Sequence, residues 1–275
     1  PAPYWVSYPD IVLLAGGKPK IIKCDEKNNF KLTPEKLTKA VSKKTKWIII
    51  NSPSNPTGSG YTKDEIIALS KILIKYKNLY ILSDDIYEHI TYDGFKFFTI
   101  AQIEKLKSRT LTMNGVSKSY SMTGWRIGYA AGPKEIIKAM AKIQSQSTSN
   151  PTSISQAAAV EALNGTQEFI SVRSNSFKER RNFVVDSLNN IKGISCLSPE
   201  GAFYVIPNCK KLLNKKTKLK TDKDFVEKLL EKAEVAVVQG SAFGLDGYFR
   251  ISYATSMENL KEAMKRIKTF CDNLN

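Results

Sequence analysis

The feature that most constrains the fold of this chain is an alternation of short apolar runs with stretches of helical periodicity, which extends from Pro1 to about Pro133. Short apolar runs bounded by Pro, Gly and Asn are typical of buried strands. The stretches between them begin at capping residues, for example Thr62, which has Glu65 three positions later. Strands that alternate with helices form βαβ units, so we predict an α/β fold with a mostly parallel sheet flanked by helices.

The expected elements divide the chain into two domains, residues 1–170 and a smaller α+β domain at 171–275. In the first domain we expect strands at 20–24, 47–50, 79–82, 109–113 and 126–131, and helices that begin at Thr33 and Thr62. After Pro133 we expect helices at 134–147, 151–163 and 166–189, then strands near 203–206, 235–238 and 249–253, and a last helix capped by Thr255 with Glu258.

Composition limits the possible classes of protein. The chain has 275 residues and a formal net charge of +16, which raises the alternative of a basic nucleic-acid-binding protein. The positive charge comes from 35 lysines and only 7 arginines, spread among acidic residues, whereas nucleic-acid sites favour arginine and interleaved aromatics. No apolar run reaches the roughly 18 residues of a transmembrane helix, and no signal peptide is evident. The four separate cysteines are compatible with a reducing cytoplasm, where we expect the protein.

Few residues are available for histidine or metal chemistry. The four cysteines lie far apart without a CxxC pair, and His89 is the only histidine. Unless His89 itself acts, this excludes Ser-His-Asp triads, HExxH zinc sites and most histidine-based acid-base schemes, and we expect no metal. We interpret His89 as a structural or rim residue.

Polar residues that follow three of the expected strands are the best candidates for a site. Asn55, Asp84 and Lys118 each lie just after an apolar run. Ligands collect at the carboxyl ends of parallel strands, where loops converge. Taken alone, Lys118 could be one more surface lysine among 35, and Asp84 a turn residue.

The same residues fit the needs of an aromatic aldehyde phosphate such as pyridoxal phosphate. That ligand requires an amine, which Lys118 provides, and a carboxylate for its ring nitrogen, which Asp84 provides. Asn55 and Tyr87 can donate to its phenolic oxygen, and Arg126 can bind its phosphate. Five complementary groups are harder to explain as structural residues than any one of them.

Four motifs carry a resemblance to a known family. They are NPTG at 55–58, SDDIYE at 83–88, SKSYSMTGWRIGY at 117–129 and YFRISYA at 248–254. In this order and spacing they resemble the class I aminotransferases of the aspartate aminotransferase superfamily, which are fold type I pyridoxal phosphate enzymes. The resemblance runs along essentially the whole chain and is strongest to the bacterial aspartate and prephenate aminotransferases.

The resemblance implies a role for each cofactor-binding residue. Lys118 would form the covalent link to pyridoxal 5′-phosphate and later move the proton at the substrate α-carbon. Asp84, rather than Asp85, would pair with the ring nitrogen, because the family's aspartate lies three residues before its tyrosine, here Tyr87. Tyr87 and Asn55 would donate to the phenolic oxygen, and Arg126 would bind the phosphate.

It also implies substrates and an assembly. Arg250 would grip the substrate α-carboxylate with two hydrogen bonds, with Asn55 beside it, and Trp5 would stack on the cofactor ring. The reaction would move an amino group between aspartate or glutamate and a 2-oxo acid such as oxaloacetate, 2-oxoglutarate or prephenate. Members of the family form homodimers with sites at the interface.

One departure from the family is the start of the chain. Members carry a further N-terminal portion before the PYW motif at 3–5, so we expect weakened cofactor binding if these residues are the whole polypeptide. The alternative to an active aminotransferase is therefore a fragment that keeps the fold but is catalytically impaired.

Overall fold

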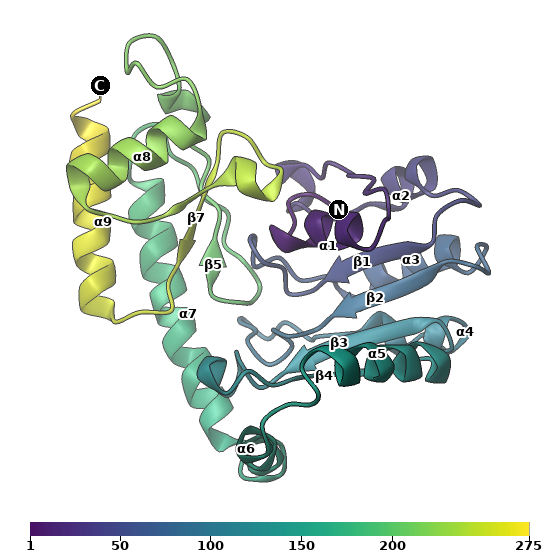
Figure 1. Cartoon of the computed structure of the whole chain (residues 1–275). Coiled ribbons are helices and arrows are strands. Elements are labelled where there is room, and N and C mark those ends of the chain that lie inside the picture. The colour runs from purple at the N-terminus through teal and green to yellow at the C-terminus, as the bar shows by residue number, and fades with distance from the viewer. Residues whose placement is uncertain (275) are drawn as a thin grey trace. The chain divides into compact units, whose positions relative to one another are not determined.

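The computed structural model describes residues 1–274, which form two compact units (Figure 1). The first unit comprises Pro1–Lys31, Ser54–Ser59 and the chain from Asn175 onward, and the second comprises Leu32–Pro53 and Gly60–Ser174. The units therefore interleave along the sequence, and the expected division into residues 1–170 and 171–275 stays a prediction.

The second unit is built on a four-stranded sheet, visible in Figure 1 as a row of blue to teal arrows. Its strands are β1 (Trp47–Asn51), β2 (Tyr80–Asp84), β3 (Thr110–Gly115) and β4 (Gly128–Ala131), in the order β1-β2-β3-β4. The first three strands are parallel and β4 is antiparallel to β3. The predicted mostly parallel sheet is confirmed.

Helices precede, connect and follow these strands along the chain, with α3 between β1 and β2 and α4 between β2 and β3. The second unit contains α2 (Pro34–Ala40), α3 (Lys63–Leu73), α4 (Glu104–Lys107), α5 (Lys134–Ser147) and α6 (Ser153–Asn164), with short 3₁₀ turns η2 (Ile100–Gln102) and η3 (Thr123–Trp125). Thr62 and Glu65 form the expected reciprocal capping box at the start of α3. None of the helices in the described residues is long and apolar enough to cross a bilayer.

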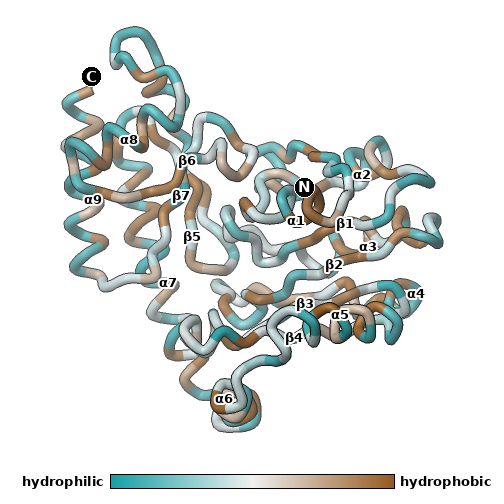
Figure 2. Tube along the Cα trace, viewed as in Figure 1, coloured by the Kyte–Doolittle hydropathy of each residue, from teal (hydrophilic) through white to brown (hydrophobic). Residues whose placement is uncertain are grey.

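Apolar side chains of the sheet and of α3 form the core of the second unit. Ile50 of β1, Ile81 of β2 and Leu69 and Leu73 of α3 are all at most 2% exposed. The strands accordingly include brown, hydrophobic stretches in Figure 2. Burial of this kind contributes about 1.5 to 3 kcal/mol for each large aliphatic side chain and holds the strand ends in register.

The first unit combines a small antiparallel sheet with helices. Its strands are β5 (Tyr204–Val205), β6 (Val238–Gln239) and β7 (Phe249–Ser252), in the order β5-β7-β6. Its helices are α1 (Ser7–Leu14), α8 (Asp222–Ala233) and α9 (Met257–Asp272), with 3₁₀ turns η1 (Glu26–Asn28), η4 (Lys210–Leu212) and η5 (Gly240–Phe243). Helix α7 (Glu168–Asn189) carries residues of both units.

The predicted strand at 20–24 is wrong. The segment makes only an isolated parallel bridge between Lys23 and Ala2, with Ala2 N donating to Ile22 O and Cys24 N donating to Ala2 O. The next N–H that could continue the ladder is that of Tyr4, and it donates instead to Phe243 O at 3.1 Å.

Three other boundaries differ from expectation. Strand β4 begins at Gly128, because Arg126 has a left-handed backbone (φ 56°) that ends η3. The last helix is capped by Ser256, whose hydroxyl accepts from Asn259 N at 3.2 Å, and not by Thr255. The expected strand at 235–238 overlaps β6 by one residue.

Candidate active site

Two of the predicted residues lie at or just after the ends of neighbouring strands in the second unit. Asp84 is the last residue of β2 and lies beside Met113 of β3 in the register of the sheet. Strand β3 ends at Gly115, so Lys118 follows three residues later. The side-chain amide of Asn51, at the end of β1, donates to Asp84 O at 2.9 Å. The loops that carry Asp84 and Lys118 therefore begin at the same edge of the sheet.

The two adjacent aspartates have different surroundings. Asp84 and Asp85 are 5% and 3% exposed. The Asp85 carboxylate accepts from the Ser83 hydroxyl at 2.7 Å, and burial raises the pKa of Asp85 to about 6. The Asp84 carboxylate accepts from Ile86 N at 3.3 Å. The Asp85 side chain is thus bonded to Ser83 and Thr99, whereas the Asp84 carboxylate is bonded to the backbone of Ile86.

The turn that carries Lys118 is fastened at several points. Lys118 O accepts from Ser121 N at 3.0 Å, and Val116, at the start of the turn, is fully buried against Ile127. The Arg173 guanidinium donates to Ser119 O at 3.2 Å. These contacts hold the backbone on both sides of Lys118, whose own side chain is partly buried.

Arg126 lies on the exposed side of this segment. Its left-handed backbone is uncommon for a residue with a β-carbon, and its Nη1 donates to Thr123 O at 2.9 Å. Arg126, which we predict to bind the phosphate, is therefore an exposed residue on a turn and not part of a strand.

Sequence reasoning missed a polar link between the two loops. The Asn114 side-chain amide donates to Glu88 Oε1 at 2.6 Å, and His89 Nε2 lies 3.4 Å from the same oxygen. Burial, and then the nearby Glu88 carboxylate, raise the pKa of Tyr120. Glu88 thus joins the loop after β2 to the end of β3. The acid at the end of SDDIYE was the only available signal.

The first unit brings together two other predicted residues, Asn55 and Arg250. Arg250 lies in β7, and its Nη1 donates to Asn55 Oδ1 at 2.8 Å. The loop that carries Asn55 is closed by two backbone bonds, from Gly58 N to Ser54 O at 2.7 Å and from Ser54 N to Ser59 O at 3.0 Å. An arginine fork and an amide are thus held within hydrogen-bonding distance.

Gly58 fixes the position of this loop. It has a φ of +70°, and a β-carbon there would lie 2.5 Å from Gly201 O and 2.5 Å from Pro199 Cβ. Gly201 N donates to Gly58 O at 2.9 Å. Only glycine accommodates both the left-handed backbone and the close approach.

Trp5 is partly buried in the first unit. Its ring contacts Tyr8 edge to face, with ring centroids 5.4 Å apart. The preceding residue, Tyr4, donates its N–H to Phe243 O at 3.1 Å. The segment that carries Trp5 is therefore tied to η5.

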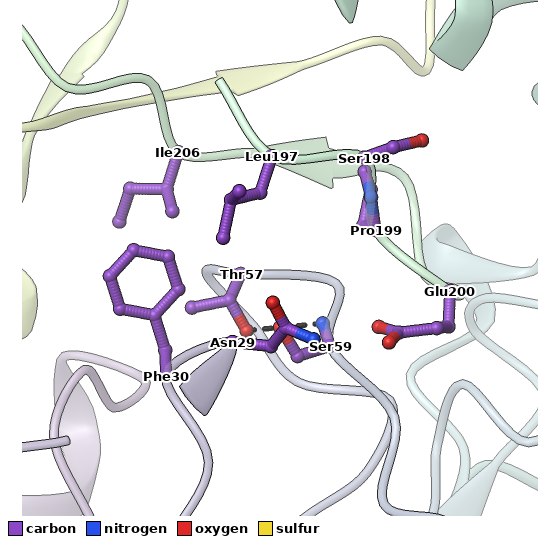
Figure 3. Close-up of a pocket in the computed structure, with 9 residues that line it drawn as sticks. All are labelled: Asn29, Phe30, Thr57, Ser59, Leu197, Ser198, Pro199, Glu200 and Ile206. Carbon is purple, nitrogen blue, oxygen red and sulfur yellow. Dashed lines mark hydrogen bonds between the residues drawn. The ribbon is translucent and has the colours of Figure 1, made fainter. Parts of the chain in front are cut away.

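A small pocket in the first unit lies beside the loop that carries Asn55 (Figure 3). Ser59 N donates to the Thr57 hydroxyl at 3.1 Å at its border. None of the predicted site residues lines this pocket, which is formed by Asn29, Phe30, Thr57, Ser59, Leu197, Ser198, Pro199, Glu200 and Ile206. It is therefore distinct from the predicted site.

Among residues 1–274, no group of three or more His, Cys, Asp or Glu side chains is placed to hold a metal ion.

Burial raises the pKa of three thiols, those of Cys196, Cys209 and Cys271, to about 12, so they are protonated at neutral pH.

The predicted residues thus form one set in each unit. Asp84, Tyr87, Lys118 and Arg126 belong to the second unit, and Trp5, Asn55 and Arg250 belong to the first.

Comparison with known proteins identifies the family. Residues 1–267 match the family described as "Aminotransferase class I and II". The chain is 58% identical to a probable aspartate/prephenate aminotransferase of Rickettsia typhi, with 100% of this chain and 70% of that protein aligned. It is 56% identical to the aspartate aminotransferase of Rhizobium meliloti, with 100% of this chain and 68% of that protein aligned.

A solved structure agrees with these matches. The crystal structure of the Rhizobium meliloti aspartate aminotransferase superposes with a TM-score of 0.95 at 56% identity, covering 99% of this chain and 69% of that one. The matches identify an enzyme family, so the nucleic-acid-binding alternative is not retained. On sequence and on structure, this chain belongs to the class I and II aminotransferases.

Proposed function

We propose that this chain is a pyridoxal-phosphate-dependent aminotransferase that moves an amino group between aspartate or glutamate and a 2-oxo acid, namely oxaloacetate, 2-oxoglutarate or prephenate. The family uses pyridoxal 5′-phosphate, and the names of the relatives from Rickettsia typhi and Rhizobium meliloti support the substrates. A homodimer and a cytoplasmic location are further parts of the proposal.

The chemistry of the available side chains fits the cofactor. Its ring nitrogen needs a carboxylate partner, and the buried Asp84 carboxylate is such a group. Its phosphate needs a cation as partner, and the exposed guanidinium of Arg126 can bind that phosphate. Lys118 is the amine on the fastened turn after β3. When bound, the cofactor supplies a ring that stabilises negative charge at the substrate α-carbon.

Each residue around the ring has a distinct task. Lys118 Nζ would hold the cofactor through a covalent bond that the substrate amine displaces, and the released amine would then move the proton from the substrate α-carbon to the cofactor. The Asp84 carboxylate keeps the ring nitrogen protonated. Tyr87, which is 3% exposed, donates its hydroxyl to the phenolic oxygen, and Asn55 does the same with its amide.

Substrate binding depends on the first unit. Arg250 binds the α-carboxylate through two parallel hydrogen bonds, a geometry that its planar fork allows. Asn55, already bonded to Arg250, contacts both the substrate and the cofactor in this proposal. Trp5 offers its ring face to the cofactor.

The observation that carries the proposal is the register of β2 and β3, in which Asp84 pairs with Met113 and Lys118 follows five residues after it. The carboxylate of Asp84 and the amine of Lys118 are therefore carried by loops that begin at adjacent strand ends. The test is absorbance of the purified protein with added pyridoxal phosphate. We expect a visible band that shifts when aspartate is added and returns with 2-oxoglutarate. A band that aspartate leaves unchanged would contradict transamination.

A further inference from the structure

The Arg250 guanidinium lies over two aromatic rings. Its Cζ is 4.5 Å from the centroid of the Tyr204 ring and 4.9 Å from the centroid of the Phe243 ring. All three residues belong to the first unit. Tyr204 is 7% exposed and Phe243 is 1% exposed, so both contacts are largely removed from water. Cation–π contacts are strongest in such desolvated places.

The Tyr204 ring is fixed by the sheet that carries Arg250. Tyr204 of β5 pairs with Ser252 of β7, two residues after Arg250. Its ring also packs on Phe203, with ring centroids 4.8 Å apart. The strand pairing fixes the backbone of Tyr204, and the contact with Phe203 restricts the position of its ring.

The Phe243 ring is fixed by the turn η5. Ser241 N, in the same turn, donates to the Asp222 carboxylate at 2.7 Å, and Asp222 is 3% exposed. Phe243 O accepts from Tyr4 N at 3.1 Å. Gly244, with a φ of +74°, ends the turn. Two hydrogen bonds, together with the turn end at Gly244, thus hold the backbone that carries Phe243.

These contacts restrict where the guanidinium can point. An arginine side chain has several rotatable bonds, and ordering it on binding costs conformational entropy. Two fixed rings and the Asn55 amide order the Arg250 side chain before any ligand binds. A carboxylate that binds later therefore does not have to bear this entropy cost. The α-carboxylate is common to every amino acid and 2-oxo acid, so such ordering would act on all substrates.

We propose that Tyr204 and Phe243 are positioning residues that orient Arg250 for the substrate carboxylate. This inference rests on the proposed function, because it needs Arg250 to bind that group. Its consequence is a loss of carboxylate affinity on removal of either ring, with the cofactor contacts unchanged.

The test measures maleate, an unreactive dicarboxylate, titrated into the protein with pyridoxal phosphate bound. Phe243→Leu and Tyr204→Leu should each raise the Kd for maleate about tenfold, which corresponds to about 1.4 kcal/mol and lies within the range of a buried cation–π contact. KM for aspartate should rise similarly, with kcat changed less than about twofold. Tyr204→Phe keeps the ring and should restore most of the affinity that Tyr204→Leu loses.

Phe225→Leu is the matched control. The Phe225 ring is fully buried in the same unit and packs on Phe249 and Phe270, with centroids 5.0 and 5.6 Å away. It should lower thermal stability about as much as Phe243→Leu but leave the Kd for maleate unchanged. If Phe243→Leu does not fold, Tyr204→Leu with Tyr204→Phe carries the test.

The outcomes separate the two proposals. Wild-type affinity for maleate in Phe243→Leu and Tyr204→Leu would overturn the positioning role while leaving the aminotransferase function intact. An equal loss of affinity in Phe225→Leu would also overturn it, since the effect would then be general loosening of the core. If the wild-type protein bound pyridoxal phosphate but neither maleate nor aspartate, the proposed function itself would be wrong.

Discussion

The two sets of site residues are held in different ways. In the second unit, the positions of Asp84 and Lys118 follow from strand register, and the side chain of Arg126 is exposed. In the first unit, Arg250 is held by side chains, with Asn55 Oδ1 at 2.8 Å and the Tyr204 and Phe243 rings within 5 Å. Strand register therefore brings the two loops of the second unit together, whereas side chains far apart in the sequence order Arg250 in the first unit.

The largest expected effect is that of Lys118→Ala. Removal of the amine should abolish the borohydride-reducible bond to pyridoxal phosphate and lower transamination by roughly a thousandfold or more, because no other group is expected to move the α-proton. Labelling with tritiated borohydride measures the first effect and a steady-state assay the second. Lys142→Ala, at an exposed lysine of α5, is the control and should behave as wild type. Equal labelling in both variants would remove Lys118 from its role.

Gly58→Ala tests the support of the first-unit set without touching its chemistry. We expect it to lower the free energy of unfolding by about 2 to 4 kcal/mol, since the left-handed backbone and the crowding against Gly201 and Pro199 both disfavour a β-carbon. Gly16→Ala separates the two causes. Its φ is +71° but nothing lies within 4 Å of the added carbon, so it should cost only about 1 kcal/mol. Equal losses in urea unfolding would show that crowding at Gly58 is unimportant.

Arg250→Lys should weaken substrate binding about 10- to 100-fold, because a point charge cannot reproduce two parallel hydrogen bonds worth about 1.5 to 3 kcal/mol each. The absorbance of the bound cofactor should not change. Titration with aspartate or maleate measures the affinity. A Kd equal to that of wild type would place the carboxylate elsewhere.

Asp85→Asn should have the smallest effect, and one that depends on pH. Because the folded pKa is raised from 3.8 to about 6, the folded state binds the Asp85 proton more tightly than the unfolded state does. This contribution to stability is fully present below pH 3.8 and is lost as the pH rises through 6. Relative to wild type, Asp85→Asn should therefore gain about 1 to 2 kcal/mol between pH 5 and pH 7.5. Parallel pH profiles in urea unfolding would contradict the raised pKa.

Local sequence patterns predicted the elements of the second unit, but not the side-chain contacts of the first. Apolar runs and the Thr62–Glu65 capping box define β1, β2, β3 and α3, and strand ends then indicate Asp84 and Lys118. Asn55 and Arg250 lie 195 residues apart, so their contact depends on tertiary structure, and only the family resemblance pointed to Arg250.

Other features had no sequence signal strong enough to use. Tyr204 and Phe243 look like ordinary core aromatics until their distances from Arg250 are known. The sequence pattern predicted a strand that begins at Arg126. Because Arg126 has a left-handed backbone, strand β4 begins only at Gly128. Local patterns predict elements, whereas contacts between distant side chains and single unusual dihedral angles do not follow from them.

The most direct test of the proposed function is the location of the cofactor on the chain. The protein would be saturated with pyridoxal phosphate, reduced with borohydride and digested, and its peptides analysed by mass spectrometry. We predict a pyridoxyl group on the peptide that contains Lys118 and on no other peptide in comparable amount. A label spread over several of the 35 lysines, or concentrated on a different one, would contradict it.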